Sequence, residues 1–410
     1  MKRVYLATNG CGVLRHEANR ILTYFLANGY EESVTAGDAD DVLLIVCGMT
    51  NEDVDFGIGQ IKKLGEETKR GARLIISGCL PAVEKIPVSG NGNIFVFTYD
   101  QLDALDKLIC AEVPLKDVFY NVGKPDHLVW PKPEKSEEML QEEVFARVID
   151  KLYPHANFLE KYRYSTRGEY IWNDEHLFQI RAAYGCAYAC SYCSSRISVG
   201  KFRSVDMMDI LSQYRLGLSK GYRQFMLIGT ELGNYGKDIG LNIVDLIKSM
   251  YEVDKTAKVG IRYIHPDCLV KYFDGLLPYM ECGFISYFCA AIQTASTRLL
   301  KMMNRTPDLG GFIDCIRQIK DRKMPVHVHS QVMVGFPSET TEDILETMLL
   351  LEECKFDYVN VNIFSPRPMT PAARMDGQIP EDVKDFRFIL MNGWQSKVRK
   401  DNLYEHLKSI

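Results

Sequence analysis

The strongest constraint on the fold is a regular alternation of short apolar, β-branched runs with longer stretches of helical character. Four such runs occupy residues 4–7, 42–46, 74–76 and 94–97. Six more follow at 178–180, 225–228, 259–261, 285–288, 326–334 and 358–364. Strands that alternate with helices predict parallel sheets covered by helices. We therefore predict an α/β protein with an N-terminal parallel sheet domain and a partial (β/α)6 barrel.

The domain boundaries follow from where the alternation stops. We predict the sheet domain at 1–114, the barrel at 173–370 and a C-terminal helical tail at 371–410. The stretch between the two domains, 115–172, carries apolar residues at helical spacing and then aromatic residues around a short turn. This pattern predicts a linker or insert with an amphipathic helix and an aromatic hairpin.

Composition limits the classes of function. Lys and Arg total 49 against 54 Asp and Glu, so the net charge is −5 and the chain lacks the overall basic character of a nucleic-acid binder. The first residues have no signal-peptide run, and no stretch approaches the roughly 20 apolar residues of a membrane span. We expect a cytoplasmic protein with no membrane partner, whose 12 cysteines are ligands, nucleophiles or core residues rather than disulfides.

Three cysteines directly follow predicted strands of the first sheet. Cys11, Cys47 and Cys79 come after the runs at 4–7, 42–46 and 74–76. Because the carboxyl ends of parallel strands share one edge of a sheet, these thiols are expected to converge. The alternative is that they are small core residues.

A second group of cysteines lies in one loop after the first barrel strand. Cys186, Cys190 and Cys193 are spaced C-x3-C-x2-C. Three thiolates can hold three corners of a 4Fe-4S cluster and leave the fourth iron open to a small molecule. A structural zinc site needs a fourth ligand, which the loop lacks, and disulfide chemistry needs only a pair. The remaining cysteines have no ligand spacing and are predicted to be core residues: Cys110, Cys268, Cys282, Cys289, Cys315 and Cys354.

The loop spacing and Tyr192 before the third cysteine match the radical-SAM superfamily, whose open iron binds S-adenosylmethionine (SAM). Further matches occur at 200–204, 228–236, 265–267, 302–305, 334–340 and 365–373. Together with the three early cysteines, they make the chain resemble the radical-SAM methylthiotransferase family, which modifies tRNA or a ribosomal protein.

The resemblance implies two 4Fe-4S clusters, SAM and an external electron donor of the flavodoxin or ferredoxin type. The catalytic cluster would be bound by Cys186, Cys190 and Cys193, and its electron would cleave SAM to a 5′-deoxyadenosyl radical that removes hydrogen from the substrate. The auxiliary cluster would be bound by Cys11, Cys47 and Cys79. It would supply sulfur, after a methyl group from another SAM has been accepted.

The resemblance also implies which residues contact SAM. Thr230 and Glu231 would meet its methionyl end and Gln293 its ribose, while backbone near Val334 and Phe364 would flank adenine. These positions follow predicted strands, which is where barrels place catalytic groups. Tyr192 and Arg305 complete the expected cofactor-binding set, with a plain Glu231–Arg305 salt bridge as the alternative for that pair.

The chain departs from the family pattern in several places. Residues 291–296 read Ala-Ile-Gln-Thr-Ala-Ser instead of the usual Pro-x-Gln-Ser-Gly-Ser, and Ser338 replaces a glycine. The family's basic C-terminal β-barrel is not expected, because the sequence ends at Ile410.

From these departures, the net charge and the aromatic insert, we expect a radical-SAM methylthiotransferase that replaces C–H with C–S–CH3 on a peptide or protein rather than on tRNA. The alternatives are the same chemistry on tRNA and radical sulfur insertion that leaves a thioether or thiol. A non-catalytic iron-sulfur electron-transfer protein is the alternative from another class.

Overall fold

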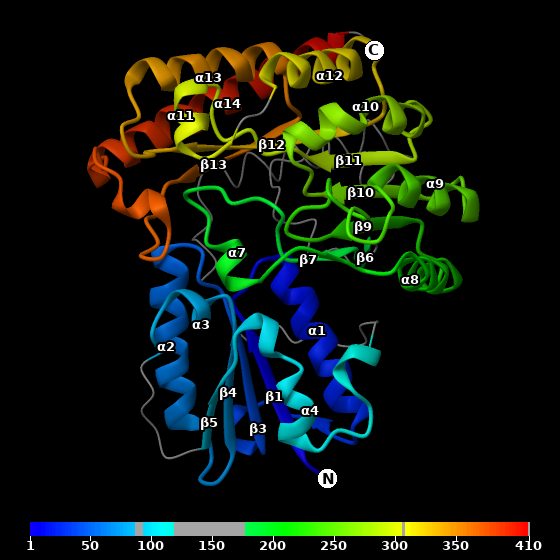
Figure 1. The fold of residues 1–410 in the computed structure, drawn as a ribbon, viewed down its shortest axis with the longest axis vertical. Helices are drawn as coiled ribbons and strands as arrows, with labels where there is room; N and C mark the ends of the chain where they lie inside the picture. Colours follow the sequence, from blue (N-terminus) through cyan, green and yellow to red (C-terminus); the bar gives the residue numbers. More distant parts are fainter. Residues whose placement is uncertain (87–92, 119–176, 306–307, 409–410) are drawn as a thin grey trace.

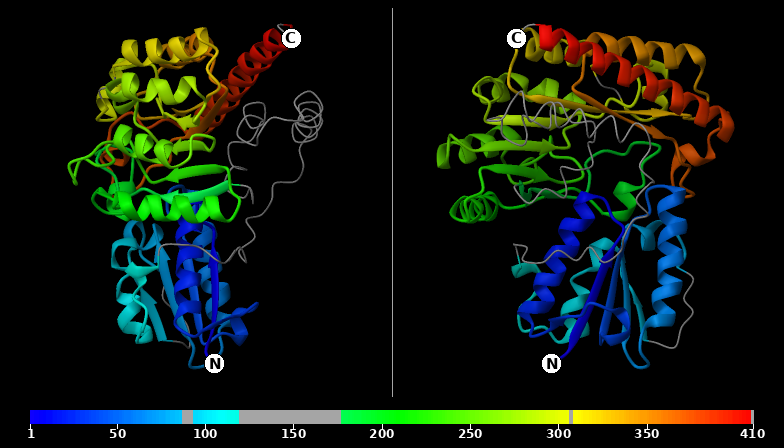
Figure 2. Two further views of the ribbon diagram at one scale, coloured as in Figure 1. Left: turned by 90° about the vertical axis from the view of Figure 1, so that its right-hand side faces the viewer. Right: turned by 180° about the vertical axis from the view of Figure 1, so that it is seen from behind.

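The computed structural model describes residues 1–86, 93–118, 177–305 and 308–408 (Figure 1). Two α/β units are stacked end to end, with the N-terminus at the far end of the first unit and the last helix on the far side of the second (Figures 1 and 2). The α/β fold class is confirmed. The amphipathic helix and aromatic hairpin expected within 115–172 lie outside the described residues. The boundaries at 114, 172 and 370 stay a prediction.

The first unit is a parallel sheet with the strand order β2-β1-β3-β4-β5. Its strands are β1 (Arg3–Thr8), β2 (Glu31–Glu32), β3 (Asp41–Val46), β4 (Arg73–Gly78) and β5 (Asn93–Val96). Helices α1 (Gly12–Ala27) and α4 (Ala104–Ile109) cover one face, and α2 (Asn51–Glu67) and α3 (Leu80–Val83) cover the other. Burial on both faces explains why the inner strands are mainly apolar. The predicted strands are confirmed, whereas β2 was not predicted because it is only two exposed glutamates.

The second unit is a six-stranded parallel sheet whose order follows the chain. Its strands are β6 (Leu177–Arg181), β9 (Gln224–Ile228), β10 (Lys258–Arg262), β11 (Ile285–Cys289), β12 (His327–Val334) and β13 (Tyr358–Ile363). All six match predicted runs. Within the described part of the chain β6 and β13 do not pair with each other, so the barrel is open, as expected.

Helices cover the outer face of this sheet (Figure 1). The longer ones are α8 (Met207–Ser219), α9 (Ile243–Val253), α10 (Pro266–Glu281), α12 (Leu309–Asp321), α13 (Thr341–Cys354) and α14 (Glu381–Lys408). The shorter elements are α7 (Ser195–Ser198), α11 (Thr297–Met302) and the antiparallel pair β7 (Ala183–Tyr184) and β8 (Arg203–Ser204). Capping boxes begin α2, α9 and α13, since in each a Thr or Asn side chain and an Asp three residues later bond each other's backbone.

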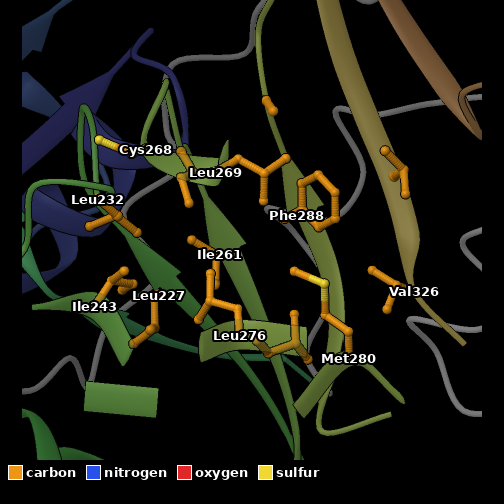
Figure 3. Packing of buried hydrophobic residues seen from close by; sticks show 14 of the residues in the cluster. Leu227, Leu232, Ile243, Ile261, Cys268, Leu269, Leu276, Met280, Phe288 and Val326 are labelled. Carbon is orange, nitrogen blue, oxygen red and sulfur yellow. The ribbon is translucent and has the colours of Figure 1, made fainter. Parts of the chain in front are cut away.

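The largest core lies between the barrel strands and these helices. Figure 3 shows Leu227, Ile261 and Phe288 of three neighbouring strands packed near Leu276 and Met280 of α10. Each is fully buried, and burying a side chain of this kind contributes about 1.5–3 kcal/mol. Side chains alternate between the two faces of a strand, so the neighbours of these core residues along each strand face the barrel interior.

A buried charge network joins the two units at the end of β6. Arg181 donates from Nη2 to the carbonyl of Val13 (2.9 Å) and to the carboxylate of Glu17 (3.3 Å), both on α1. Arg20 pairs with the same carboxylate. Burial alone would raise the pKa of Glu17, but the charges of Arg20 and Arg181 lower it to about 2. The carboxylate is therefore ionised at neutral pH and ties α1 to the barrel.

Replacing Arg181 with methionine is expected to destabilise the full chain by about 3 kcal/mol, because it removes one of the two cations from a buried carboxylate. The midpoint of urea unfolding measures this loss. Arg317→Met is the matched control, since Arg317 and its partner Glu353 have side chains 53% and 50% exposed. Such a pair contributes at most about 1 kcal/mol. Equal shifts in the two variants would contradict a special role for the buried network.

Candidate active site

The three early cysteines lie together at the carboxyl edge of the first sheet. They follow β1, β3 and β4, which are neighbours in that sheet. Cys47 and Cys79 are buried and Cys11 is exposed. Gly78 allows the close approach of two of these strand ends: its φ is +104°, and a Cβ there would lie 2.5 Å from the carbonyl oxygen of Val46. The predicted convergence is thus present in the structure.

The environment of these thiols resists ionisation unless a cation is supplied. Burial is the main cause that raises the pKa of Cys79 to about 12, with the charge of Cys11 next. Burial and then the charge of Cys79 also raise the pKa of Cys47 well above its usual value. A bound metal reverses this balance, because a coordinating thiol loses its proton outright. The donor set fits an iron-sulfur cluster for that reason.

The second cysteine group occupies the loop between β7 and α7. Gly185 begins the loop with φ +66°. A Cβ at this position would also collide with the backbone of Lys201, so the position requires glycine. The amide of Cys193 bonds the carbonyl of Cys190 at 3.1 Å, so these two thiols lie on one tight turn. Burial is the main cause that raises the pKa of Cys186 to about 12.

Residues from distant parts of the barrel hold this loop. The hydroxyl of Ser191 donates to the carbonyl of Met302 at 2.8 Å, and its own carbonyl accepts from the amide of Ala372 at 2.9 Å. Arg305 is buried and donates to the Tyr192 hydroxyl (3.3 Å) and, at the longer distance of 3.9 Å, to the sulfur of Cys190. Arg305 therefore places a fixed positive charge beside one of the three thiols.

The two cysteine groups face each other across the junction of the units. Helix α3, which follows Cys79, packs against α7, which follows Cys193. The Ser198 hydroxyl bonds the Cys79 thiol, and the charge of Cys193 contributes to the raised pKa of Cys79. One thiol of the early triad, Cys79, therefore lies close to Cys193 of the loop triad.

In the described ranges, no three Cys, His, Asp or Glu side chains come close enough to share one metal ion. A cubane of four irons is larger than one ion, so its three ligands stand farther apart than the ligands of a tetrahedral zinc. The two iron-sulfur clusters stay a prediction.

Thr230 and Glu231 lie just beyond β9, as expected, but the Glu231 carboxylate is already occupied. It accepts from the amide and the side chain of Asn234 (3.1 and 2.9 Å) and from the amide of His265 (3.3 Å). The His265 ring stacks on Tyr188 at 3.9 Å, within the cysteine loop. The expected alternative of a Glu231–Arg305 salt bridge is wrong, since each side chain has other partners.

The other predicted SAM contacts also lie at strand ends. Gln293 lies just beyond β11, Val334 ends β12, and Phe364 follows β13. Gln293 has φ +72°, and its side-chain Oε1 is buried without a hydrogen-bond partner. A buried acceptor without a donor is costly, and a ligand hydroxyl would satisfy it. The carbonyl of Val334 already accepts from the amide of Phe364 at 2.9 Å. This bond joins the ends of β12 and β13 at the place where adenine is expected.

The sequence did not single out the polar residues beside Cys47. Its sulfur donates to the Asp53 carboxylate at 3.5 Å, and Arg367 reaches the first turn of α2 from beyond β13 to bond Asn51. The only signal for Arg367 was that it fell within a matching stretch. The prediction that the other cysteines are core residues is wrong for Cys110 and Cys282, which are exposed.

The fold and this site define a radical SAM enzyme. Residues 180–351 match the model of the Radical SAM superfamily, and residues 3–94 match that of the Uncharacterized protein family UPF0004. The fold is also that of the radical SAM methyltransferase TsrM from Kitasatospora setae, solved with cobalamin and a [4Fe-4S] cluster bound. The TM-score is 0.54 at 12% identity over 91% of this chain and 77% of that one.

Two curated relatives extend over nearly the whole chain. The tRNA-2-methylthio-N(6)-dimethylallyladenosine synthase of Bacillus anthracis is 27% identical over 98% of this chain and 74% of that protein. Its Bacillus subtilis counterpart is 26% identical over 99% and 74%. Together, the two family models and these relatives support a radical-SAM methylthiotransferase, an enzyme that transfers a methylthio group with SAM and [4Fe-4S] chemistry. No described helix is both long and apolar enough to cross a membrane.

Proposed function

We propose that the enzyme replaces a C–H bond of a tRNA base with C–S–CH3, using one cluster on each cysteine triad. The observation that carries the proposal is the meeting of two cysteine triads, one from each unit, at a single junction. The names of the two relatives support tRNA rather than the peptide or protein expected from net charge. Net charge is a sum over the chain and says nothing of where basic side chains gather.

In this proposal Cys186, Cys190 and Cys193 hold the catalytic cluster, and the early triad holds the auxiliary one. When bound, the first supplies the electron that cleaves SAM and the second supplies the sulfur. A cofactor is needed because no side chain has a pKa matched to an unactivated carbon. An external donor of the flavodoxin or ferredoxin type provides the electrons.

The chain's own side chains orient SAM. Gln293 accepts a hydrogen bond from a ribose hydroxyl at its unpartnered Oε1. Thr230, half-buried beyond β9, meets the methionyl end. Backbone near Val334 and Phe364, at the ends of β12 and β13, flanks adenine.

Two charged side chains complete the proposed site. Glu231 holds the backbone of His265, whose ring stacks on Tyr188 of the cysteine loop. Through this loop it indirectly positions the methionyl end of SAM. Arg305 keeps Tyr192 and Cys190 in place beside the same end.

Anaerobically reconstituted protein is expected to add a methylthio group to an anticodon-loop base when given unmodified tRNA, SAM and a reductant. Binding should weaken about tenfold or more between 50 and 200 mM salt, because contacts to several phosphates release counterions. Mass spectrometry of digested tRNA and a binding titration at both salt concentrations measure the two effects. Cys190→Ala is the control that should bind tRNA without turnover.

Two results would contradict this proposal. Salt-independent or undetectable tRNA binding, with the mass of a methylthio group on a cellular peptide, would restore the peptide substrate. A tRNA product that carries a thiol or thioether without the methyl group would identify sulfur insertion alone.

A further inference from the structure

Arg367 occupies an unusual position between the two units. It follows the last barrel strand, yet its side chain is only 4% exposed because it lies against the first turn of α2. Its Nη2 donates to Oδ1 of Asn51 and to the hydroxyl of Ser365 (2.6 Å). The amide of Asn51 also donates to that hydroxyl, at 3.2 Å. The guanidinium is thus fixed at the junction by neutral groups.

This buried cation lacks a full set of partners. Its Nε is buried with no hydrogen-bond acceptor, and no carboxylate of the described residues forms an ion pair with it. Removal from water lowers the pKa of Arg367, which shows that burial outweighs the nearby negative charges. Burying a charge without a counter-charge is expensive, so an anion is expected nearby in the working enzyme.

The negative charges that act on Arg367 are, in decreasing order, those of Asp53, Glu84, Asp55 and Cys47 of the early cysteine triad. Cys47 and Asp53 are in contact at 3.5 Å, and Asp53 is on the same helical turn as Asn51. Three thiolates around a cluster, beside the Asp53 carboxylate, would make this region strongly anionic.

The other triad has a similar arrangement. Arg305 is 6% exposed, has a buried Nε without a partner and donates toward the sulfur of Cys190. One buried arginine without a carboxylate partner therefore stands beside each cysteine triad. Net charge and hydrogen bonds near the sulfurs are two of the factors that set the reduction potential of an iron-sulfur cluster.

We infer that Arg367 is a positioning residue that offsets the negative charge of the auxiliary cluster and raises its reduction potential. The inference rests on the proposed cluster at Cys11, Cys47 and Cys79. It gives the barrel a direct electrostatic influence on a cluster whose ligands all belong to the other unit.

The test uses the full chain with Cys186, Cys190 and Cys193 replaced by alanine, so that only the auxiliary cluster remains. Iron analysis should give about four atoms per chain. A redox titration followed by electron paramagnetic resonance then compares Arg367→Gln with its parent. At equal applied potential the reduced-to-oxidised ratio should fall about tenfold, which is 59 mV for one electron. Arg367→Lys, which keeps the charge, should restore most of the ratio.

Asn51→Ala is the matched control, because it removes the hydrogen bond to Arg367 and leaves the charge. An unchanged ratio is expected. An equal fall in Asn51→Ala would show a structural role and overturn the inference, as would an unchanged ratio in Arg367→Gln. Weaker tRNA binding by Arg367→Gln without a change in ratio would assign the arginine to a substrate phosphate instead. An iron-free parent would refute the auxiliary cluster itself, before any potential is measured.

Discussion

Cys190→Ala is expected to abolish 5′-deoxyadenosine and methylthiolated product together. The three thiols of the loop hold the catalytic cluster in our proposal, and Cys190 is the one that Arg305 approaches at 3.9 Å. Loss of this ligand should leave SAM cleavage at the background of the protein-free reaction. Chromatography with mass detection, after anaerobic incubation with SAM and dithionite, measures both products.

Cys282→Ala serves as the control for thiol removal, since Cys282 is exposed and lies at the end of α10. It should keep both activities. Formation of 5′-deoxyadenosine by Cys190→Ala at the wild-type rate would show that the catalytic cluster lies elsewhere.

Replacement of Cys11, Cys47 and Cys79 by alanine should separate the two halves of the reaction. We expect 5′-deoxyadenosine formation to persist and methylthio transfer to be lost, because the sulfur source is removed while the loop triad is intact. Iron should fall from about eight atoms per chain to about four. Wild-type protein with about four irons, unchanged by the triple replacement, would contradict the second cluster.

The packing of α3 on α7 complicates that triple variant, because Cys79 bonds Ser198 beside the other triad. Cys11→Ala is the cleaner form of the test. Cys11 is exposed, so its removal creates no buried cavity. It should lose methylthio transfer while its rate of SAM cleavage matches wild type.

Periodicity was sufficient to predict the fold because it is a local property. Each strand of the two large sheets, apart from the two-residue β2, appears in the sequence as a short apolar run. The convergence of Cys11, Cys47 and Cys79 was predictable for a related reason: parallel strands end at a common edge, whatever the length of chain between them.

Long-range polar contacts were not predictable in this way. Asn51 and Arg367 are 316 positions apart, and no repeat or spacing in the chain indicates that they meet. Glu231 and Arg305 were considered possible partners because opposite charges attract. In the structure, the Glu231 carboxylate accepts hydrogen bonds from backbone amides such as that of His265. Arg305 donates to the carbonyl of Ala291, the phenol of Tyr192 and the thiol of Cys190. Partners brought close by the fold from distant parts of the chain decided these pairings.

Gly78 places a limit on how this enzyme can vary during evolution. A Cβ at this position would lie 2.5 Å from the carbonyl oxygen of Val46, and main-chain atoms cannot rotate away. Any larger residue would push β4 from β3 and increase the distance between Cys79 and Cys47. Descendants that keep both thiols as ligands of one cluster are therefore confined to glycine at this position, whereas a lineage that abandons the cluster is free to replace it.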